Sequence, residues 1–90
     1  MVLLITYDLH KPERDYEAVI ARIKSFGSCV HDEESVWLAD TTKTPEECRE
    51  ALKAVTTNAT YFIVQLRQHW SAYKLSEGVA NWLNAAERRW

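Results

Sequence analysis

The stretch LITYDLHKPERDY, residues 4–16, changes character in its middle. Its first residues are apolar or favour β-structure, and from Asp8 onward it becomes a polar and charged cluster. A β-branched and aromatic run bounded by such a cluster predicts a strand, here over residues 2–7. Asp8 stands where this predicted strand ends, so it is either a working carboxylate or a residue that only terminates the strand.

The segment after this cluster predicts an amphipathic helix over residues 13–26. Pro12 lies near its start, and Gly27 stands where a helix C-terminus favours a positive φ. The apolar side chains recur at the spacing of one helix face. They are Tyr16, Val19, Ile20, Ile23 and Phe26.

The middle of the chain predicts a hairpin and a second helix. Two short runs, residues 28–31 and 35–40, flank an acidic turn. Thr44 is a favourable N-cap, and Glu47 three residues later completes a capping box, which predicts a helix over residues 45–55.

The last third predicts one more strand and one more helix. Residues 60–67 alternate like a strand with two unlike faces. Ser76 is a suitable N-cap for a C-terminal helix of about residues 76–88, in which apolar residues again keep helical spacing.

The element order β-α-β-β-α-β predicts one α+β domain over residues 1–90, a ferredoxin-like antiparallel sheet with an additional C-terminal helix. Alternation along the strands predicts that one set of side chains faces the helices: Leu3, Ile5, Tyr7, Phe62, Val64 and Leu66. The opposite face is then too apolar to leave in water, so either the C-terminal helix or a second subunit should cover it. We predict a homodimer that the C-terminal segment helps to form, on its own sheet or on its partner's. The expected interface residues are Leu4, Thr6, Tyr61, Ile63 and Trp82.

Composition limits the classes of function. The net charge is −2, so no global cationic field draws the chain to nucleic acid or to a membrane. The apolar runs are too short for a membrane span and the start lacks the pattern of a signal peptide, so a cytoplasmic protein is expected. Cys29 and Cys48 are expected to be buried free thiols, because no metal-ligand or disulfide pattern surrounds them.

Several of these stretches together resemble a known family. They are LITYDLHKP as the first strand, VWLAD as the third, TPEECREAL as the second helix, YFIVQL as the fourth strand and LSEGVANWL near the end. In these stretches the chain is similar to the small SinR-family proteins, which belong with the CRISPR-associated Cas-two-like and VapD-like group. The resemblance implies a ferredoxin-like homodimer with an aspartate at the end of the first strand beside the dimer axis, a position that Asp8 matches. It also implies either phosphodiester hydrolysis with a divalent metal or a non-catalytic scaffold that clamps duplex DNA.

The chemistry of Asp8 is compatible with either role. Two Asp8 carboxylates across a dimer axis, completed by waters and a substrate phosphate, suffice to bind Mg²⁺ or Mn²⁺. Lys11, Arg14 and His10 are then the candidates to bind the phosphate, and His10 is also a candidate acid or base. Alternatively, Asp8 bonds local backbone and helps to cap the first helix.

Charge balance favours the scaffold. Lys11 and Arg14 are offset by neighbouring acids, whereas a duplex clamp profits from a broad basic surface. Arg88 and Arg89 beside Trp90 fit either a phosphate-and-stacking element or, as the favoured interpretation, a solvated helix end.

We therefore expect a non-catalytic dimeric scaffold that associates with DNA, RNA or a protein partner. The alternatives are a metal-dependent endonuclease that uses Asp8 with Mg²⁺ or Mn²⁺, and a protein-binding module that presents an edge strand or its C-terminal helix.

Overall fold

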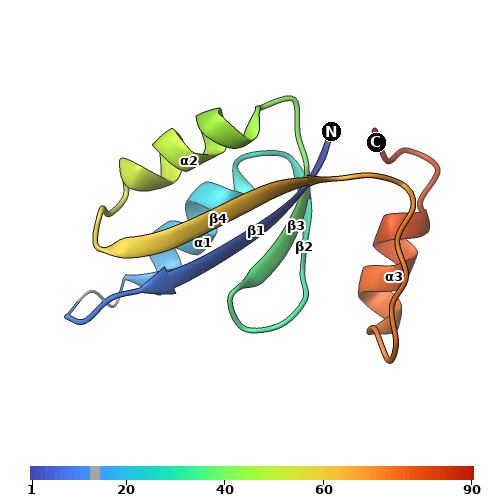
Figure 1. The fold of residues 1–90 in the computed structure, drawn as a ribbon, viewed down its shortest axis with the longest axis horizontal. Coiled ribbons are helices and arrows are strands. Elements are labelled where there is room, and N and C mark those ends of the chain that lie inside the picture. The colour runs from blue at the N-terminus through green and yellow to red at the C-terminus, as the bar shows by residue number, and fades with distance from the viewer. Residues whose placement is uncertain (13–14) are drawn as a thin grey trace.

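The computed structural model describes residues 1–12 and 15–90. The chain folds as an α+β domain, a ferredoxin-like antiparallel sheet of four strands in the order β2-β3-β1-β4 with an extra C-terminal helix (Figure 1). This confirms the predicted fold class. The elements are β1 (Val2–Leu9), α1 (Tyr16–Lys24), β2 (Ser28–His31), β3 (Val36–Asp40), α2 (Pro45–Lys53), β4 (Ala59–Leu66) and α3 (Glu77–Asn84).

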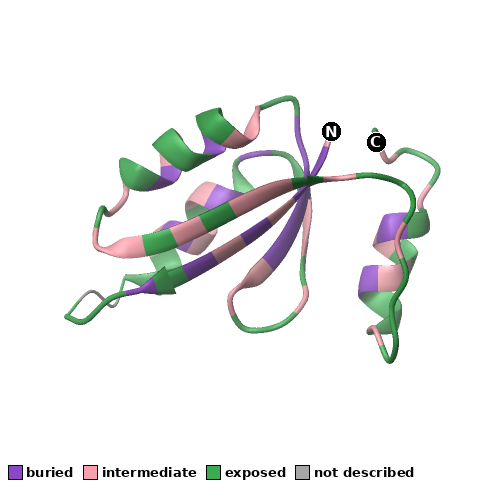
Figure 2. Cartoon of the chain, in the orientation of Figure 1, coloured by how far each residue is buried: buried purple, intermediate pink, exposed green. Residues whose placement is uncertain are grey.

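One face of the sheet packs against α1 and α2 and holds the main core. Leu3 and Ile5 of β1, Ile23 of α1 and Leu52 of α2 are completely buried there. Figure 2 shows the buried residues along β1 and β3 and on the helix sides that face the sheet. No helix in the described residues is long and apolar enough to cross a bilayer.

The helix and strand bounds differ most from the predicted ones at three places, and the remaining differences are of one or two residues. The strand β1 continues through Asp8 to Leu9, because Asp8 still pairs with Thr60 of β4. Asp8 therefore does not end the strand. Within the described residues α1 begins at Tyr16 rather than at residue 13 and is capped by Asp15, which accepts a 3.2 Å bond from the Ala18 N–H. The third difference is α3, which ends at Asn84.

The predicted faces of β1 are confirmed, but those of β4 are wrong. In the register, Ile5 pairs with Ile63 and Tyr7 with Tyr61, so Tyr61 and Ile63 share the face of α1 and α2. The Tyr61 hydroxyl donates toward the carbonyl oxygens of Leu52 at 3.2 Å and Thr56 at 2.8 Å. Both sets of β4 side chains contain apolar residues, so alternation alone did not decide which set faces the helices.

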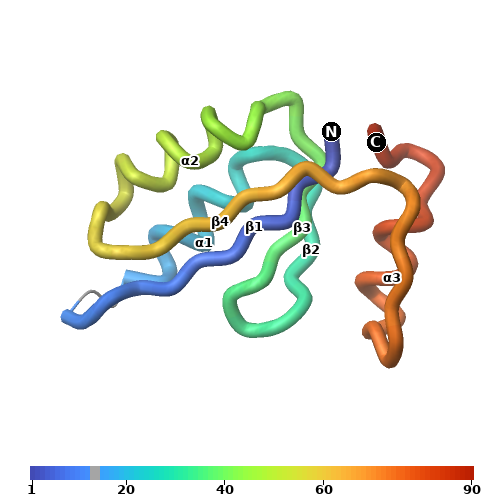
Figure 3. Tube along the Cα trace, viewed as in Figure 1, coloured from blue at the N-terminus to red at the C-terminus, as the bar shows by residue number. Residues whose placement is uncertain are grey.

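The second face of the sheet is half covered by α3 of the same chain. Val79 and Leu83 of α3 pack with Leu38 of β3 in a separate apolar cluster, which also includes Leu4 and Leu66. The ten residues between β4 and α3, 67–76, contain no helix or strand and carry the chain around the end of the sheet. Figure 3 shows the two chain termini close together at that end.

Candidate functional site

The half of the second face that α3 leaves open is the first candidate site. We call it the open half and define it by Thr6 and Asp8 of β1 and Thr60 and Phe62 of β4, which alternate onto this face and pair across the two strands. Phe62 leaves 63% of its surface exposed, which is unusual for a large aromatic in the middle of a strand. The open half therefore presents an apolar ring between polar neighbours.

Asp8 lies at the outer end of the open half. It is exposed, and among the described residues its carboxylate has no hydrogen-bond donor or ion-pair partner. Asp8 also lines a cleft of about 330 Å³ together with Glu34 and Ser35 from the turn between β2 and β3 and with Tyr16 of α1. Sequence reasoning placed Glu34 in the acidic turn of the predicted hairpin and did not indicate that this turn reaches Asp8.

His10 is fixed beside Asp8 by contacts with the start of β4. Its Nε2 lies 2.9 Å from the Thr60 Oγ1, and its main chain exchanges bonds with Asn58, whose O and Nδ2 both lie at 2.9 Å. Lys11 follows in an exposed turn. Arg14, the other predicted phosphate ligand, lies outside the described residues. The structure thus brings Asp8, His10 and Lys11 to one end of the sheet.

The predicted interface residues fall into three groups. Thr6 lies on the open half, whereas Leu4 and Trp82 belong to the cluster beneath α3. Tyr61 and Ile63 lie on the helix-covered face, so they cannot take part in a dimer formed through the open half. Whether the chain dimerises stays a prediction.

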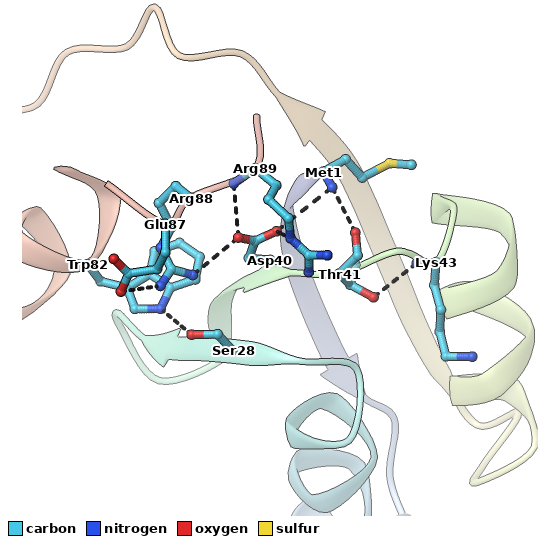
Figure 4. Close-up of polar contacts among 9 residues, drawn as sticks. All are labelled: Met1, Ser28, Asp40, Thr41, Lys43, Trp82, Glu87, Arg88 and Arg89. Atoms are coloured by element: carbon cyan, nitrogen blue, oxygen red, sulfur yellow. Dashed lines mark hydrogen bonds and ion pairs between the residues drawn. The ribbon is translucent and has the colours of Figure 1, made fainter. Parts of the chain in front are cut away.

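A second carboxylate, Asp40 at the end of β3, lies where both termini meet, and sequence reasoning did not single it out. Asp40 is 3% exposed. Its Oδ2 accepts a bond of 3.0 Å from the Arg89 N–H and lies 3.4 Å from the Arg88 guanidinium (Figure 4). Its Oδ1 lies 3.3 Å from the Arg89 Nε and 3.8 Å from the Met1 ammonium.

Arg88 joins this carboxylate to α3. Its side chain is 4% exposed, and its guanidinium lies over the Trp82 ring at 4.1 Å. The Trp82 Nε1–H donates to the Ser28 Oγ at 3.1 Å, which ties the same ring to β2. The favoured interpretation of Arg88 as part of a solvated helix end is therefore wrong, because α3 ends before it and the chain turns back onto the sheet.

The cysteines and the other potential metal ligands form no further site among the described residues. Cys48 is fully buried and Cys29 is half-buried, and burial raises the pKa of both thiols. Within residues 1–12 and 15–90, no three histidine, cysteine, aspartate or glutamate side chains come together to hold a metal ion. Comparison of this chain with models of known protein families, with curated proteins and with solved structures found no match.

Proposed function

We propose that the chain is a dimeric scaffold that holds single-stranded nucleic acid on the open half of its sheet. The observation that carries the proposal is the exposed ring of Phe62, held by the strand pairing of β4 with β1. A base stacks on such a ring through its π-face, and this contact tolerates any sequence. The SinR-like resemblance, which also implies a dimeric scaffold, points in the same direction.

The neighbours of Phe62 suit a nucleic acid backbone. Thr6, Thr60 and the His10 ring offer hydrogen-bond groups on the same side, and Lys11 supplies a cation at the end of β1. Asp8 opposes this cation, so we expect modest affinity and a strong dependence on salt. A flexible single strand needs fewer simultaneous phosphate contacts than a duplex clamp does.

Fluorescence anisotropy with labelled single-stranded RNA and DNA tests the proposal. We expect Phe62→Ala to weaken binding by roughly 5- to 150-fold, since base stacking on an aromatic ring contributes about 1–3 kcal/mol. Tyr73→Ala is the matched control, because Tyr73 is 87% exposed but lies in the segment between β4 and α3. Equal affinities for wild type and Phe62→Ala, or no binding at low salt, would leave a protein partner as the ligand of the scaffold.

A metal-dependent endonuclease is the second candidate, because Asp8 and Glu34 line the same cleft. Two carboxylates with waters and a substrate phosphate can complete an octahedral shell around Mg²⁺ or Mn²⁺. The second carboxylate then comes from the same chain rather than from Asp8 of another copy.

Cleavage of labelled RNA and DNA with Mg²⁺ or Mn²⁺ decides this second candidate. Asp8→Asn and Glu34→Gln should each abolish cleavage if the cleft holds the metal. Glu33→Gln is the control, because Glu33 lies in the same turn and does not line the cleft. An inactive wild type, or variants as active as wild type, would eliminate the endonuclease.

A further inference from the structure

The outer edge of β4 is a long and regular sheet edge. In the strand order β2-β3-β1-β4, β4 comes last, and no strand among the described residues pairs with its outer side. Its eight residues include no proline and no charged side chain, and they pair with β1 without a bulge. Proteins commonly protect such edges with prolines, charges or bulges, because an open edge recruits another strand.

The hydrogen-bond pattern identifies which main-chain groups of β4 point outward. The His10 N–H donates to the Asn58 carbonyl at 2.9 Å, next to the β1–β4 ladder, whereas the Tyr7 N–H donates to the Ser35 carbonyl at 3.3 Å on the other side. In an antiparallel sheet, the main-chain N–H and C=O groups of successive residues point to opposite sides of the strand. The even-numbered residues of β4 therefore bond to β1. The N–H and C=O groups of Ile63 and Gln65 therefore point away from the sheet.

Charged side chains flank this edge in a pattern that suits a second copy of the chain. Glu46 of α2 lines a groove of about 220 Å³ along β4, beside Ile63. Arg67 follows the last residue of β4. Within the described residues neither Glu46 nor Arg67 belongs to an ion pair. A two-fold related pair of edges brings the acid of each copy toward the base of the other, as a self-complementary interface requires.

We propose that two copies pair antiparallel through their β4 edges, about a two-fold axis at Val64. Ile63 and Gln65 then exchange main-chain hydrogen bonds with the partner's Gln65 and the partner's Ile63, and Arg67 approaches the partner's Glu46. This inference rests on the dimeric part of the proposed function. The helices of both copies lie on one side of the joined sheet, so the two open halves form one continuous surface on the other.

Cysteine cross-linking tests the register. Val64 directly faces the partner's Val64 at a non-hydrogen-bonded position, where Cα atoms lie about 4.5 Å apart, within the range a disulfide spans. We expect Val64→Cys to form a covalent dimer on mild oxidation. Thr60→Cys, on the same strand and the same face, should stay monomeric under denaturing conditions, as should wild type. Absence of the Val64→Cys dimer, or equal cross-linking of Thr60→Cys, would overturn the proposed register.

A proline substitution tests the edge itself. Gln65→Pro removes an outward N–H and no bond to β1, so the sheet should tolerate it. Light scattering should show the mass falling from twice 10.5 kDa to 10.5 kDa, while Gln65→Ala remains dimeric. If Gln65→Pro fails to fold, the cross-linking result decides.

The outcomes separate this inference from the proposed function. A folded Gln65→Pro that remains dimeric overturns edge pairing and leaves the dimeric scaffold standing. A monomeric wild type overturns both the edge pairing and the dimer. Nucleic-acid binding is judged independently of either result by comparing Phe62→Ala with Tyr73→Ala.

Discussion

At the scale of single residues, Asp40 is the carboxylate on which the covering of the second face depends. It is buried together with the Arg88 guanidinium, and a buried charge is costly unless it is paired. The pair therefore matters for stability mainly because removal of one member leaves the other charged group buried without that counter-ion. Without Asp40, the buried Arg88 guanidinium would keep only the exposed Glu87 as an ion-pair partner, and the Arg89 side chain and the Met1 ammonium would lose their carboxylate.

We predict that Asp40→Ala lowers the free energy of unfolding by about 3–5 kcal/mol, as is typical when one member of a buried ion pair is removed. Glu50→Ala is the control, because Glu50 is 58% exposed and pairs with Arg49 and Lys53 on the surface of α2. Removing such a surface pair should cost much less, because water and salt screen exposed charges. Urea denaturation of both variants measures the difference, and equal losses would contradict the structural role of Asp40.

Contacts between residues far apart in the chain, such as Asp40 and Arg88, could not be predicted from the sequence. Asp40 and Arg88 are far apart in the chain, and periodicity extended α3 across Arg88 as if it were still helical. Asp8 was recognised because it follows an apolar run, whereas its neighbour Glu34 was not. Their proximity depends on the register of β1 with β3, which no local pattern encodes.

At the scale of elements, the start of α2 was predicted correctly, because it is encoded locally. Thr44 and Glu47 form the reciprocal capping box, with bonds of 3.1 Å from the Glu47 N–H and 2.9 Å from the Thr44 N–H. The hydrogen bond from the Thr44 main chain is the main cause of the lowered pKa of Glu47. The charged form is thus the one that the folded state favours.

This lowered pKa makes the stability of α2 dependent on pH. A carboxyl whose pKa is lowered by folding contributes stability above its unfolded value of 4.5, and that contribution is lost as the pH falls through the folded pKa. We predict that the destabilisation caused by Glu47→Gln is largest at neutral pH and shrinks on acidification. Thermal unfolding of both proteins between neutral and acidic pH measures it. A stability difference between wild type and Glu47→Gln that does not change with pH would contradict the role of the charged Glu47 in the capping box.

The strand β4 was predicted less well, for a physical reason. Tyr61 and Ile63 on one side compete with Phe62 and Val64 on the other, and both sets are apolar enough for a core. Tertiary contacts decide between them, because α2 and the segment that follows it offer main-chain acceptors to the Tyr61 hydroxyl. A shift of one residue in strand register moves every side chain of the strand to the opposite face of the sheet. Tyr61 and Ile63, which were predicted for the dimer interface, therefore lie on the helix-covered face.

At the scale of the whole molecule, the second face of the sheet is divided along its length into a covered part and an open part. The part near the chain termini is covered by α3 of the same chain, and the part near Asp8 and Phe62 is open. The sequence predicted that this face needs covering, and the choice between its own helix and a second copy was left open. In the structure, α3 packs on the sheet of its own chain.

This arrangement predicts that α3 stabilises each copy separately. Leu83 is 6% exposed in the cluster under α3, so Leu83→Ala should lower the free energy of unfolding by about 2–5 kcal/mol. The loss should be the same at every protein concentration, and light scattering should give the same mass as for wild type. Dimer formation adds a separate, concentration-dependent stability by mass action, which Gln65→Pro rather than Leu83→Ala should remove.

Phe62→Ala is the control within the same face. Its ring is mostly exposed in the single chain, so its loss should change the stability of each copy by no more than about 0.5 kcal/mol. If Leu83→Ala instead converted a dimer into monomers, α3 would have to cover the partner's sheet rather than its own. The part of the second face that α3 covers would then be the interface of an exchanged dimer, and both Leu83 and Gln65 would contribute to dimer formation.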